Sequence, residues 1–310
     1  MKITFTLLLF ISFILWAYYA YKNTEKYTLD SQARKQLGGD YLQIPLGVVH
    51  YELAGDEAAD IVVMVHGLSV PAFLWEPTFQ FLKARGYRVL RFDLLGRGLS
   101  DRPETEYGIE LYSEQILQIL DTLQIKKPVN LMGLSMAGPI VARFTNEHPE
   151  RVKRLILQDP LVHKIPAKKV FPLQIPFVGE YLATVVFMPG LIALNTTADH
   201  DDKVANWQKL YLQQSRYKGF RRSLVSSLRY LSNHRLVSEY ETLSTNPVAK
   251  LLVWGTEDST IPISESESLI QLMPSMEFKA IEGAGHVPSI DKPDEFNQIL
   301  LDFLQQETSH

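Results

Sequence analysis

Apolar residues recur in two patterns along the chain, and from about residue 45 the two patterns alternate. Short runs of consecutive apolar residues predict buried strands, whereas longer segments with apolar residues at helical spacing predict amphipathic helices. The expected strands are residues 47–53, 61–65, 88–92, 128–132, 154–158, 251–254 and 276–281, and the expected helices are residues 73–84, 110–123, 136–147, 265–272 and 294–305. This alternation predicts an α/β fold with a mostly parallel, doubly wound sheet that is covered by helices on both faces.

The alternation stops between residues 161 and 247, where the sequence is helical or irregular and shows no strand pattern. We therefore expect a core formed by residues 45–160 and 248–306, interrupted by a helical cap at 161–247. Residues 24–40 are polar and indicate a linker or a short helix over the membrane surface, and we place the linker at residues 24–44. Residues 170–194 are strongly apolar, as expected for a cap that packs on the core, for an acyl-chain tunnel, or for a lid that faces a membrane.

The amino terminus carries a long uncharged segment, residues 3–21, which ends in a cluster of aromatic residues before Lys22. About 20 apolar residues span a bilayer core as a helix, and aromatic rings favour the membrane interface. The segment predicts a transmembrane anchor over residues 1–23 and a membrane location. The alternative is a cleaved signal peptide and a secreted protein, because Ala17 and Ala20 form a weak cleavage pattern.

The amino-acid composition excludes several classes of function. The 310 residues carry a formal net charge of −4 and contain no cysteine. The sequence has no basic run interleaved with aromatic residues, so nucleic-acid binding is not expected. The lack of cysteine excludes disulfides, a cysteine nucleophile and thiolate metal ligands. We expect neither a metal nor a cofactor.

The segment GLSMAG at residues 133–138 carries the first catalytic signal. It joins an expected strand to an expected helix through small residues, as in the G-x-S-x-G turn that exposes a serine nucleophile. Ala137 stands where that pattern has its second glycine. A structural turn with an idle serine is the alternative to a nucleophilic Ser135.

A serine nucleophile needs a base, and the base needs a carboxylate that orients it. Asp258 lies in a loop that leaves an expected strand, and His286 lies in the loop after the last expected strand. Both therefore belong to the same sheet edge as Ser135, where sites of open α/β sheets form. Asp159 and Glu257 are the alternative acids.

An oxyanion that forms on the substrate requires two fixed hydrogen-bond donors. The backbone N–H of Met136, directly after Ser135, is one candidate. The backbone N–H of Leu68, in the turn after the strand at 61–65, is the other. His66 in the same turn is expected to be structural.

Taken together, these segments resemble the α/β-hydrolase superfamily. The resemblance covers about residues 45–306 and rests on residues 66–68, 93–100, 133–138, 254–262 and 285–288. It implies the α/β-hydrolase fold with a serine carboxylesterase or lipase activity, and the anchor and cap resemble those of membrane-anchored monoacylglycerol lipases. Residues 93–100 look like the structural turn of the family. The expected partner is a small-molecule ester or lipid.

Two other functions remain open at this point. A peptidase or amidase of the same fold would need an acidic pocket in the cap, where the only clear acidic cluster spans residues 199–202. A non-catalytic, ligand-binding member of the superfamily is the second alternative.

Overall fold

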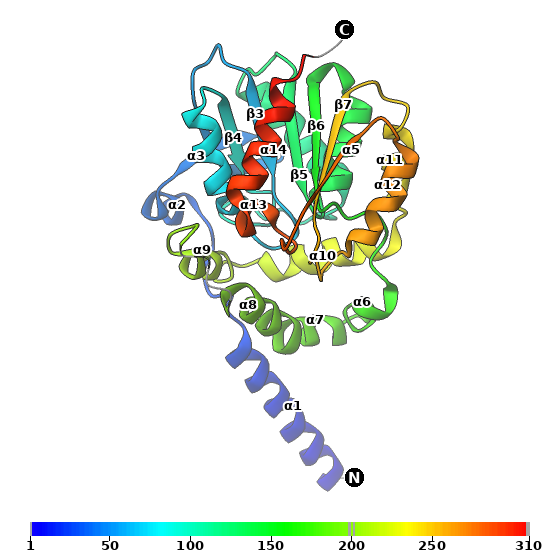
Figure 1. Ribbon diagram of the computed structural model, residues 1–310. Coiled ribbons are helices and arrows are strands. Elements are labelled where there is room, and N and C mark those ends of the chain that lie inside the picture. The colour runs from blue at the N-terminus through cyan, green and yellow to red at the C-terminus, as the bar shows by residue number, and fades with distance from the viewer. Residues whose placement is uncertain (1, 198–199, 201, 308–310) are drawn as a thin grey trace.

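A single eight-stranded sheet forms the centre of the molecule (Figure 1). The computed structural model describes residues 2–197, 200 and 202–307. The strand order is β1-β2-β4-β3-β5-β6-β7-β8. The strands are β1 (Asp40–Ile44), β2 (Gly47–Ala54), β3 (Ile61–Val65), β4 (Arg88–Phe92), β5 (Val129–Leu134), β6 (Val152–Gln158), β7 (Ala249–Gly255) and β8 (Glu277–Ile281).

The direction of the strands follows their composition. From β4 to β8 all neighbours are parallel, whereas β1, β2 and β4 pair in antiparallel fashion at one edge. Every residue of β3 and β5 is buried. A parallel strand covered by helices on both faces requires such a continuous apolar run, so the predicted parallel sheet is confirmed.

Helices cover both faces of the sheet. The side chains of α4, α5, α11 and α12 contribute to one apolar core, and those of α3 and α14 contribute to the other. The helices are α1 (Lys2–Lys22), α2 (Ser31–Leu37), α3 (Glu76–Ala84), α4 (Ile109–Thr122), α5 (Ala137–Glu147), α6 (Ala167–Gln174), α7 (Val178–Leu182), α8 (Met188–Thr197), α9 (Trp207–Gln214), α10 (Phe220–Asn233), α11 (Val237–Leu243), α12 (Ser266–Leu272), α13 (Pro288–Asp291) and α14 (Pro293–Gln305). The short turns are η1 (Ala72–Trp75), η2 (Pro149–Arg151), η3 (Ala183–Phe187, a π-helical segment) and η4 (Ile263–Glu265).

The insertion between β6 and β7 is helical in its described residues, as predicted, and contains α6 to α11. Helices α6 to α10 lie across one end of the sheet (Figure 1). They cover the edge at which β5 and β7 end, and residues of both the cap and the core line one cavity there.

The segment 24–44 contains the short helix that its polar sequence allowed and also a strand that was not predicted. It contains the short helix α2 and the edge strand β1, which pairs with β2 over residues 40–44. Only Ile44 of β1 is fully buried. A short edge strand that buries one residue leaves almost no hydrophobic alternation, so its sequence does not reveal it.

Residues 3–21 form part of one continuous helix, α1, as predicted. Its side chains are exposed from residue 4 to residue 16 and partly covered at Ala17, Tyr19, Ala20 and Lys22. The helix projects away from the rest of the molecule beyond the cap (Figure 1). By length and composition, residues 4–22 and 178–197 could each cross a membrane. The first is as compatible with a signal sequence as with an anchor, and the second is the cap segment α7-η3-α8.

Candidate active site

Ser135 occupies a sharp turn between β5 and α5. Its φ angle is +56°, a left-handed conformation that is unfavourable for a residue with a Cβ atom. The turn is held by three backbone hydrogen bonds: Ser135 N–H donates to the Gln158 carbonyl (3.0 Å), and the Ser135 carbonyl accepts from the N–H groups of Gly138 and Leu161 (2.9 Å each). Such strain is typical of a nucleophile whose side chain is forced out of the chain path.

The glycines of this turn explain why Ala137 is tolerated. A Cβ at Gly133 would lie 2.7 Å from the Ala137 carbonyl oxygen, and one at Gly138 would lie 2.6 Å from the Tyr240 hydroxyl. Ala137 itself starts α5 and fits as a fully buried residue. Both Gly133 and Gly138 are therefore required for close packing in this turn, and the second of them lies one residue later than in the sequence pattern.

The loop after β3 lies directly against Ser135. A Cβ at Gly67 would lie 3.2 Å from the Ser135 Cβ and 3.7 Å from its Oγ. Within the described residues, neither the N–H of Leu68 nor that of Met136 has a hydrogen-bond partner. Both donors are therefore free to bind an oxygen atom, as expected for an oxyanion hole.

His66 fixes this loop. Its Nε2 accepts from the Leu94 N–H (2.9 Å), and its Nδ1 donates to the Gly67 carbonyl (2.8 Å). Burial lowers the pKa of His66 to about 4, so the ring is neutral near pH 7. Both ring nitrogens are occupied, and His66 has the structural role expected for it.

Arg97 links the same loop to the cap. Its guanidinium donates to the Leu68 carbonyl (2.5 Å), to Ser223 Oγ (2.7 Å) and to Ser227 Oγ (2.9 Å). Both serines belong to α10, and the Arg97 side chain is completely buried. This link was not predicted, although Ser223 and Ser227 are four residues apart and therefore share one face of a helix.

Residues 93–100 form a structural turn, in agreement with the prediction. The Asp93 carboxylate accepts from the N–H groups of Ala72 and Leu99 (2.9 Å each) and pairs with His50 Nδ1 at 2.8 Å. The partner His50 and these hydrogen bonds outweigh burial and hold the pKa of Asp93 far below its usual range. A permanently ionised, fully engaged carboxylate stabilises the turn and has no free oxygen for chemistry.

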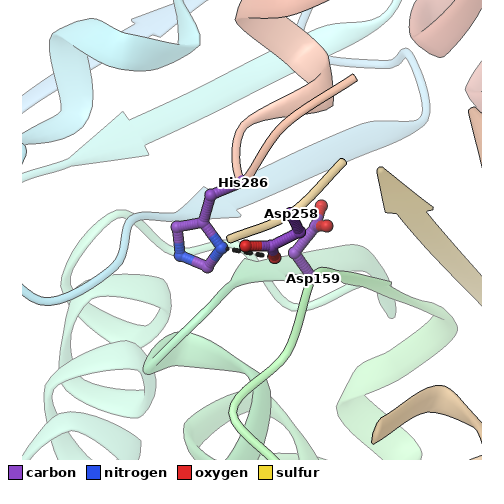
Figure 2. Close-up of side chains that lie close together, drawn as sticks. All are labelled: Asp159, Asp258 and His286. Carbon is purple, nitrogen blue, oxygen red and sulfur yellow. Dashed lines mark hydrogen bonds and ion pairs between the residues drawn. The ribbon is translucent and has the colours of Figure 1, made fainter. Parts of the chain in front are cut away.

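Asp258 and His286 form a hydrogen-bonded pair at the same edge. Asp258 Oδ2 lies 2.7 Å from His286 Nδ1 (Figure 2). The other oxygen, Oδ1, accepts from the backbone N–H groups of Thr260 (2.7 Å) and Ile261 (2.9 Å). The carboxylate is thus fixed by its own loop, and its bond to Nδ1 leaves Nε2 of His286 for a substrate or a nucleophile.

The alternative acids are placed differently. Glu257 is exposed and does not contact His286. Asp159, which follows β6, is fully buried beside Asp258 (Figure 2), and its Oδ1 accepts from the Gly255 N–H at 2.9 Å. Burial is the main cause, and the neighbouring Asp258 a further one, of a pKa well above the usual range for Asp159.

The ligand atoms of Asp159, Asp258 and His286 lie within 4.8 Å of one another. That spacing alone would suit a cation. However, Nδ1 of His286 already binds Asp258 directly, and Asp159 favours its neutral form, which is a poor ligand for a cation. The arrangement fits a hydrogen-bonded acid–base pair better than a metal site.

Ser135 and His286 line the same cavity, which has a volume of about 730 Å³. The structure shows no hydrogen bond between these two described residues; such bonds are often long before substrate binds. The cap contributes apolar walls, including Ile165, Leu191 and Leu194. It also contributes polar groups, including His163, Lys164, Lys169 and His200. A largely apolar cavity with a few polar groups is the usual form of a small-molecule site.

The acidic cluster at 199–202 lies partly outside the described residues. Asp202 is described and does not line the cavity. Among the described residues, the acidic side chains of the cavity wall are those of Glu265 and Asp291, which belong to the core.

Comparisons with known proteins agree with this architecture. A 2-hydroxy-6-oxononadienedioate/2-hydroxy-6-oxononatrienedioate hydrolase of Paraburkholderia xenovorans is 25% identical over 267 residues, which is 83% of this chain and 90% of that protein. Among solved structures, an enol-lactonase from Burkholderia xenovorans superposes with a TM-score of 0.73 at 23% identity, over 86% of this chain and 100% of the other. A thermophilic esterase from Thermogutta terrifontis superposes with a TM-score of 0.72 at 19% identity, over 86% and 98%.

These two structural similarities show a shared fold. The sequence profile of the alpha/beta hydrolase fold family matches residues 60–293, which is most of the chain. The match includes the Ser135 turn, the cap, Asp258 and His286. The chain belongs to the alpha/beta hydrolase fold family.

Proposed function

We propose that the protein is a serine hydrolase that cleaves carboxylic esters through an acyl-enzyme intermediate. The observation that carries this proposal is the juxtaposition of a strained Ser135 with a hydrogen-bonded Asp258–His286 pair on one cavity. In this arrangement each residue has the chemical role that acyl transfer requires.

In the proposed mechanism, His286 Nε2 takes the proton of Ser135 Oγ while Oγ attacks the ester carbonyl carbon. The N–H groups of Leu68 and Met136 stabilise the oxyanion. The tetrahedral intermediate collapses, the alcohol leaves with the proton from His286, and an acyl group remains on Ser135. Water then attacks the acyl-enzyme by the same steps, releasing the acid and restoring Ser135.

Asp258 orients His286 and stabilises its charged form. Its side chain is fully buried and is held by two backbone N–H groups and by Nδ1 of His286. These bonds fix the tautomer in which Nε2 can act as a base.

For the substrate we propose an acyl-lipid ester such as a monoacylglycerol. The apolar cap residues of the cavity can accept an acyl chain, and the exposed apolar helix α1 would hold the protein in a membrane as a single-pass anchor. Each buried methylene contributes about 0.8 kcal/mol. Catalytic efficiency should therefore rise with acyl length over several carbons.

A second candidate is hydrolysis of an anionic oxo-dienoate, the kind of substrate that the name of the Paraburkholderia xenovorans relative gives for that protein. Lys164 and Lys169 line the cavity and favour this candidate, because a lysine at the wall can bind a substrate carboxylate. A receptor without catalysis would not need the strained serine, and an aminopeptidase would need an acidic cap wall.

A substrate panel distinguishes these candidates. Purified protein would be assayed on aryl esters and monoacylglycerols of increasing chain length, on a 2-hydroxy-6-oxo-dienoate and on amino-acid amides. Ser135→Ala serves as the control for each activity. The proposal predicts ester hydrolysis that increases with chain length, whereas preference for the dienoate or the amides would refute the lipid-ester assignment.

A further inference from the structure

The cap exposes large apolar side chains that do not line the cavity. We define the cap apolar face as five residues from α6 to η3: Phe171, Ile175, Phe177, Val178 and Val186. Their exposed fractions run from 36% for Ile175 to 89% for Phe177. Large apolar side chains that are exposed together in one segment indicate an interaction site.

Phe177 is the most unusual member of this face. Its φ angle is +61°, a conformation that is strained for a bulky residue. The aromatic ring is nonetheless almost completely exposed. The exposed ring gains little from packing on the described residues, and its backbone conformation is unfavourable. The strained turn therefore holds the Phe177 ring outward.

Helix α1 leaves the body beside the cap segment α7-η3-α8 (Figure 1). The rings of Tyr19 in α1 and Tyr181 in α7 stack with centroids 6.3 Å apart. The Glu25 carboxylate accepts from the N–H groups of Gly219 (3.0 Å) and Arg221 (2.5 Å). Since residues just after α1 are bound to the cap, the two cannot move independently.

The length of α1 places this contact at a membrane surface. At 1.5 Å per residue, its 21 residues extend over about 30 Å, the thickness of a bilayer hydrocarbon core. Lys22 and Lys26 follow the apolar segment. If α1 spans a bilayer, the cap apolar face lies at the level of the lipid head groups.

The charges around this face suit an anionic lipid surface. Between residues 161 and 197 the only acidic residue is Glu180. Its carboxylate is paired with Arg229 at 3.3 Å. Lys168 belongs to the same stretch and, unlike Lys164 and Lys169, does not line the cavity. A lysine near an anionic membrane is attracted to it.

We propose that the cap apolar face docks on the membrane, with the Phe177 ring inserted among the lipid head groups and acyl chains. This inference rests on the anchor in the proposed function and extends it to the cap. The cavity walls Leu191 and Leu194 belong to the same helical segment. A lipid ester would therefore pass from the bilayer to Ser135 without crossing bulk water.

The absence of cysteine from the chain allows a direct test. Phe177→Cys is labelled with an environment-sensitive nitrobenzoxadiazole dye, and the full chain is reconstituted in vesicles of phosphatidylcholine and phosphatidylglycerol. Glu57→Cys is the control, because its side chain is 91% exposed and the loop before β3 lies at the opposite end of the sheet (Figure 1).

The proposal predicts blue-shifted emission and quenching by spin-labelled lipid at position 177 but not at position 57. Equal quenching of both positions by aqueous iodide would overturn it. A blue shift that lipid spin labels do not quench and that grows with protein density would instead show a second copy on this face. The readout needs no hydrolysis and is repeated in Ser135→Ala, so it is independent of the proposed catalysis.

A separate observation concerns Asp159. Its Oδ1 accepts from Gly255, whereas its buried Oδ2 has no hydrogen-bond partner among the described groups unless a proton is present. The titratable groups around it are Asp258, His286 and Asp291. Two adjacent buried carboxyl groups cannot both be ionised at low cost.

The proton must reside on Asp159. Asp258 accepts two backbone N–H bonds and one from His286, which stabilise its charge, whereas Asp159 accepts only one. We infer that Asp159 is a neutral positioning residue that donates its O–H to the Asp258 carboxylate and thereby limits the basicity of His286. This inference rests on the proposed Asp258–His286 pair.

Two substitutions test the role of Asp159. Asp159→Asn keeps a neutral donor and should leave the pKa of His286 unchanged. Asp159→Ala removes the donor, concentrates charge on Asp258 and should raise that pKa by about one unit. The pKa is measured by NMR titration of the His286 ring, assigned with His286→Gln, and by the pH dependence of Ser135 labelling with a fluorophosphonate.

The NMR titration remains informative even if the protein hydrolyses no ester. A His286 pKa that falls in Asp159→Asn would show that Asp159 is ionised and would overturn the inference. Identical titrations in all three proteins would show that Asp159 is only a packing residue.

Discussion

The strain at Ser135 predicts an unusual order of stability among its substitutions. Ser135→Ala keeps a Cβ atom at φ +56°, whereas Ser135→Gly removes it. The left-handed conformation costs a residue with a Cβ roughly 1–2 kcal/mol, and glycine loses roughly 0.5–1 kcal/mol through its greater freedom in the unfolded chain. The glycine variant should therefore be more stable than the alanine variant by about 1 kcal/mol.

For a protein of this size, that difference corresponds to a Tm higher by about 2 °C. It is measured by thermal unfolding of the detergent-solubilised chain at one scan rate. Ser226 in the middle of α10 is the matched control. Its Oγ accepts one hydrogen bond, from the Tyr107 N–H, and substitution by alanine or by glycine removes that bond equally. There the order should reverse, because glycine is about 1 kcal/mol worse than alanine inside a helix.

An equal or lower Tm for Ser135→Gly, compared with Ser135→Ala, would refute the reasoning. It would mean that the left-handed turn carries no stored strain. A lower Tm for both Ser135 variants than for the native chain would indicate instead that the hydroxyl stabilises the fold.

Three further outcomes are expected. Gly67→Ala should fold but react more slowly with an active-site probe, because its methyl group would lie 3.2 Å from the Ser135 Cβ. The rate of labelling measures this effect, and an unchanged rate would argue against close contact between the loop after β3 and Ser135. Arg97→Met should lower the free energy of unfolding by roughly 3 kcal/mol, since it removes bonds to Leu68 and to α10 and leaves buried acceptors unsatisfied; a urea titration with no change would contradict that link. His66 has a pKa of about 4 in the fold and an ordinary value of 6.5. Its contribution of about 3 kcal/mol to the free energy of unfolding is therefore complete above pH 6.5 and is lost as the pH falls towards 4. In urea titrations at several pH values, His66→Gln should show a smaller loss of stability over this range.

The parts of the fold that the sequence predicts well have local physical causes. Strand β3 is buried on both faces and is therefore apolar at every position, which a single sequence shows directly. The turn at Ser135 needs small residues within a few positions of one another, and these too are visible in sequence. The candidate acid and base follow from the rule that parallel strands end at one edge.

The remaining features depend on contacts between distant segments. The edge strand β1 is defined by pairing with β2 rather than by its own pattern. Arg97 reaches serines more than 120 residues away in α10. Asp159 and Asp258 lie at the ends of two neighbouring strands, and the whole cap separates them in the sequence. The sequence therefore offered them as alternative candidates for the catalytic acid, although the two carboxyl groups are neighbours in the structure.

The central claim is that Ser135 is the nucleophile, activated by His286 and Asp258. Its most direct test is labelling of the full chain with a fluorophosphonate probe, followed by mass spectrometry of the modified peptide. The account predicts one adduct, on Ser135, which disappears in Ser135→Ala and forms at least about a hundredfold more slowly in His286→Gln, because general base catalysis contributes that much or more. An adduct on another residue, or labelling that persists in Ser135→Ala, would contradict it.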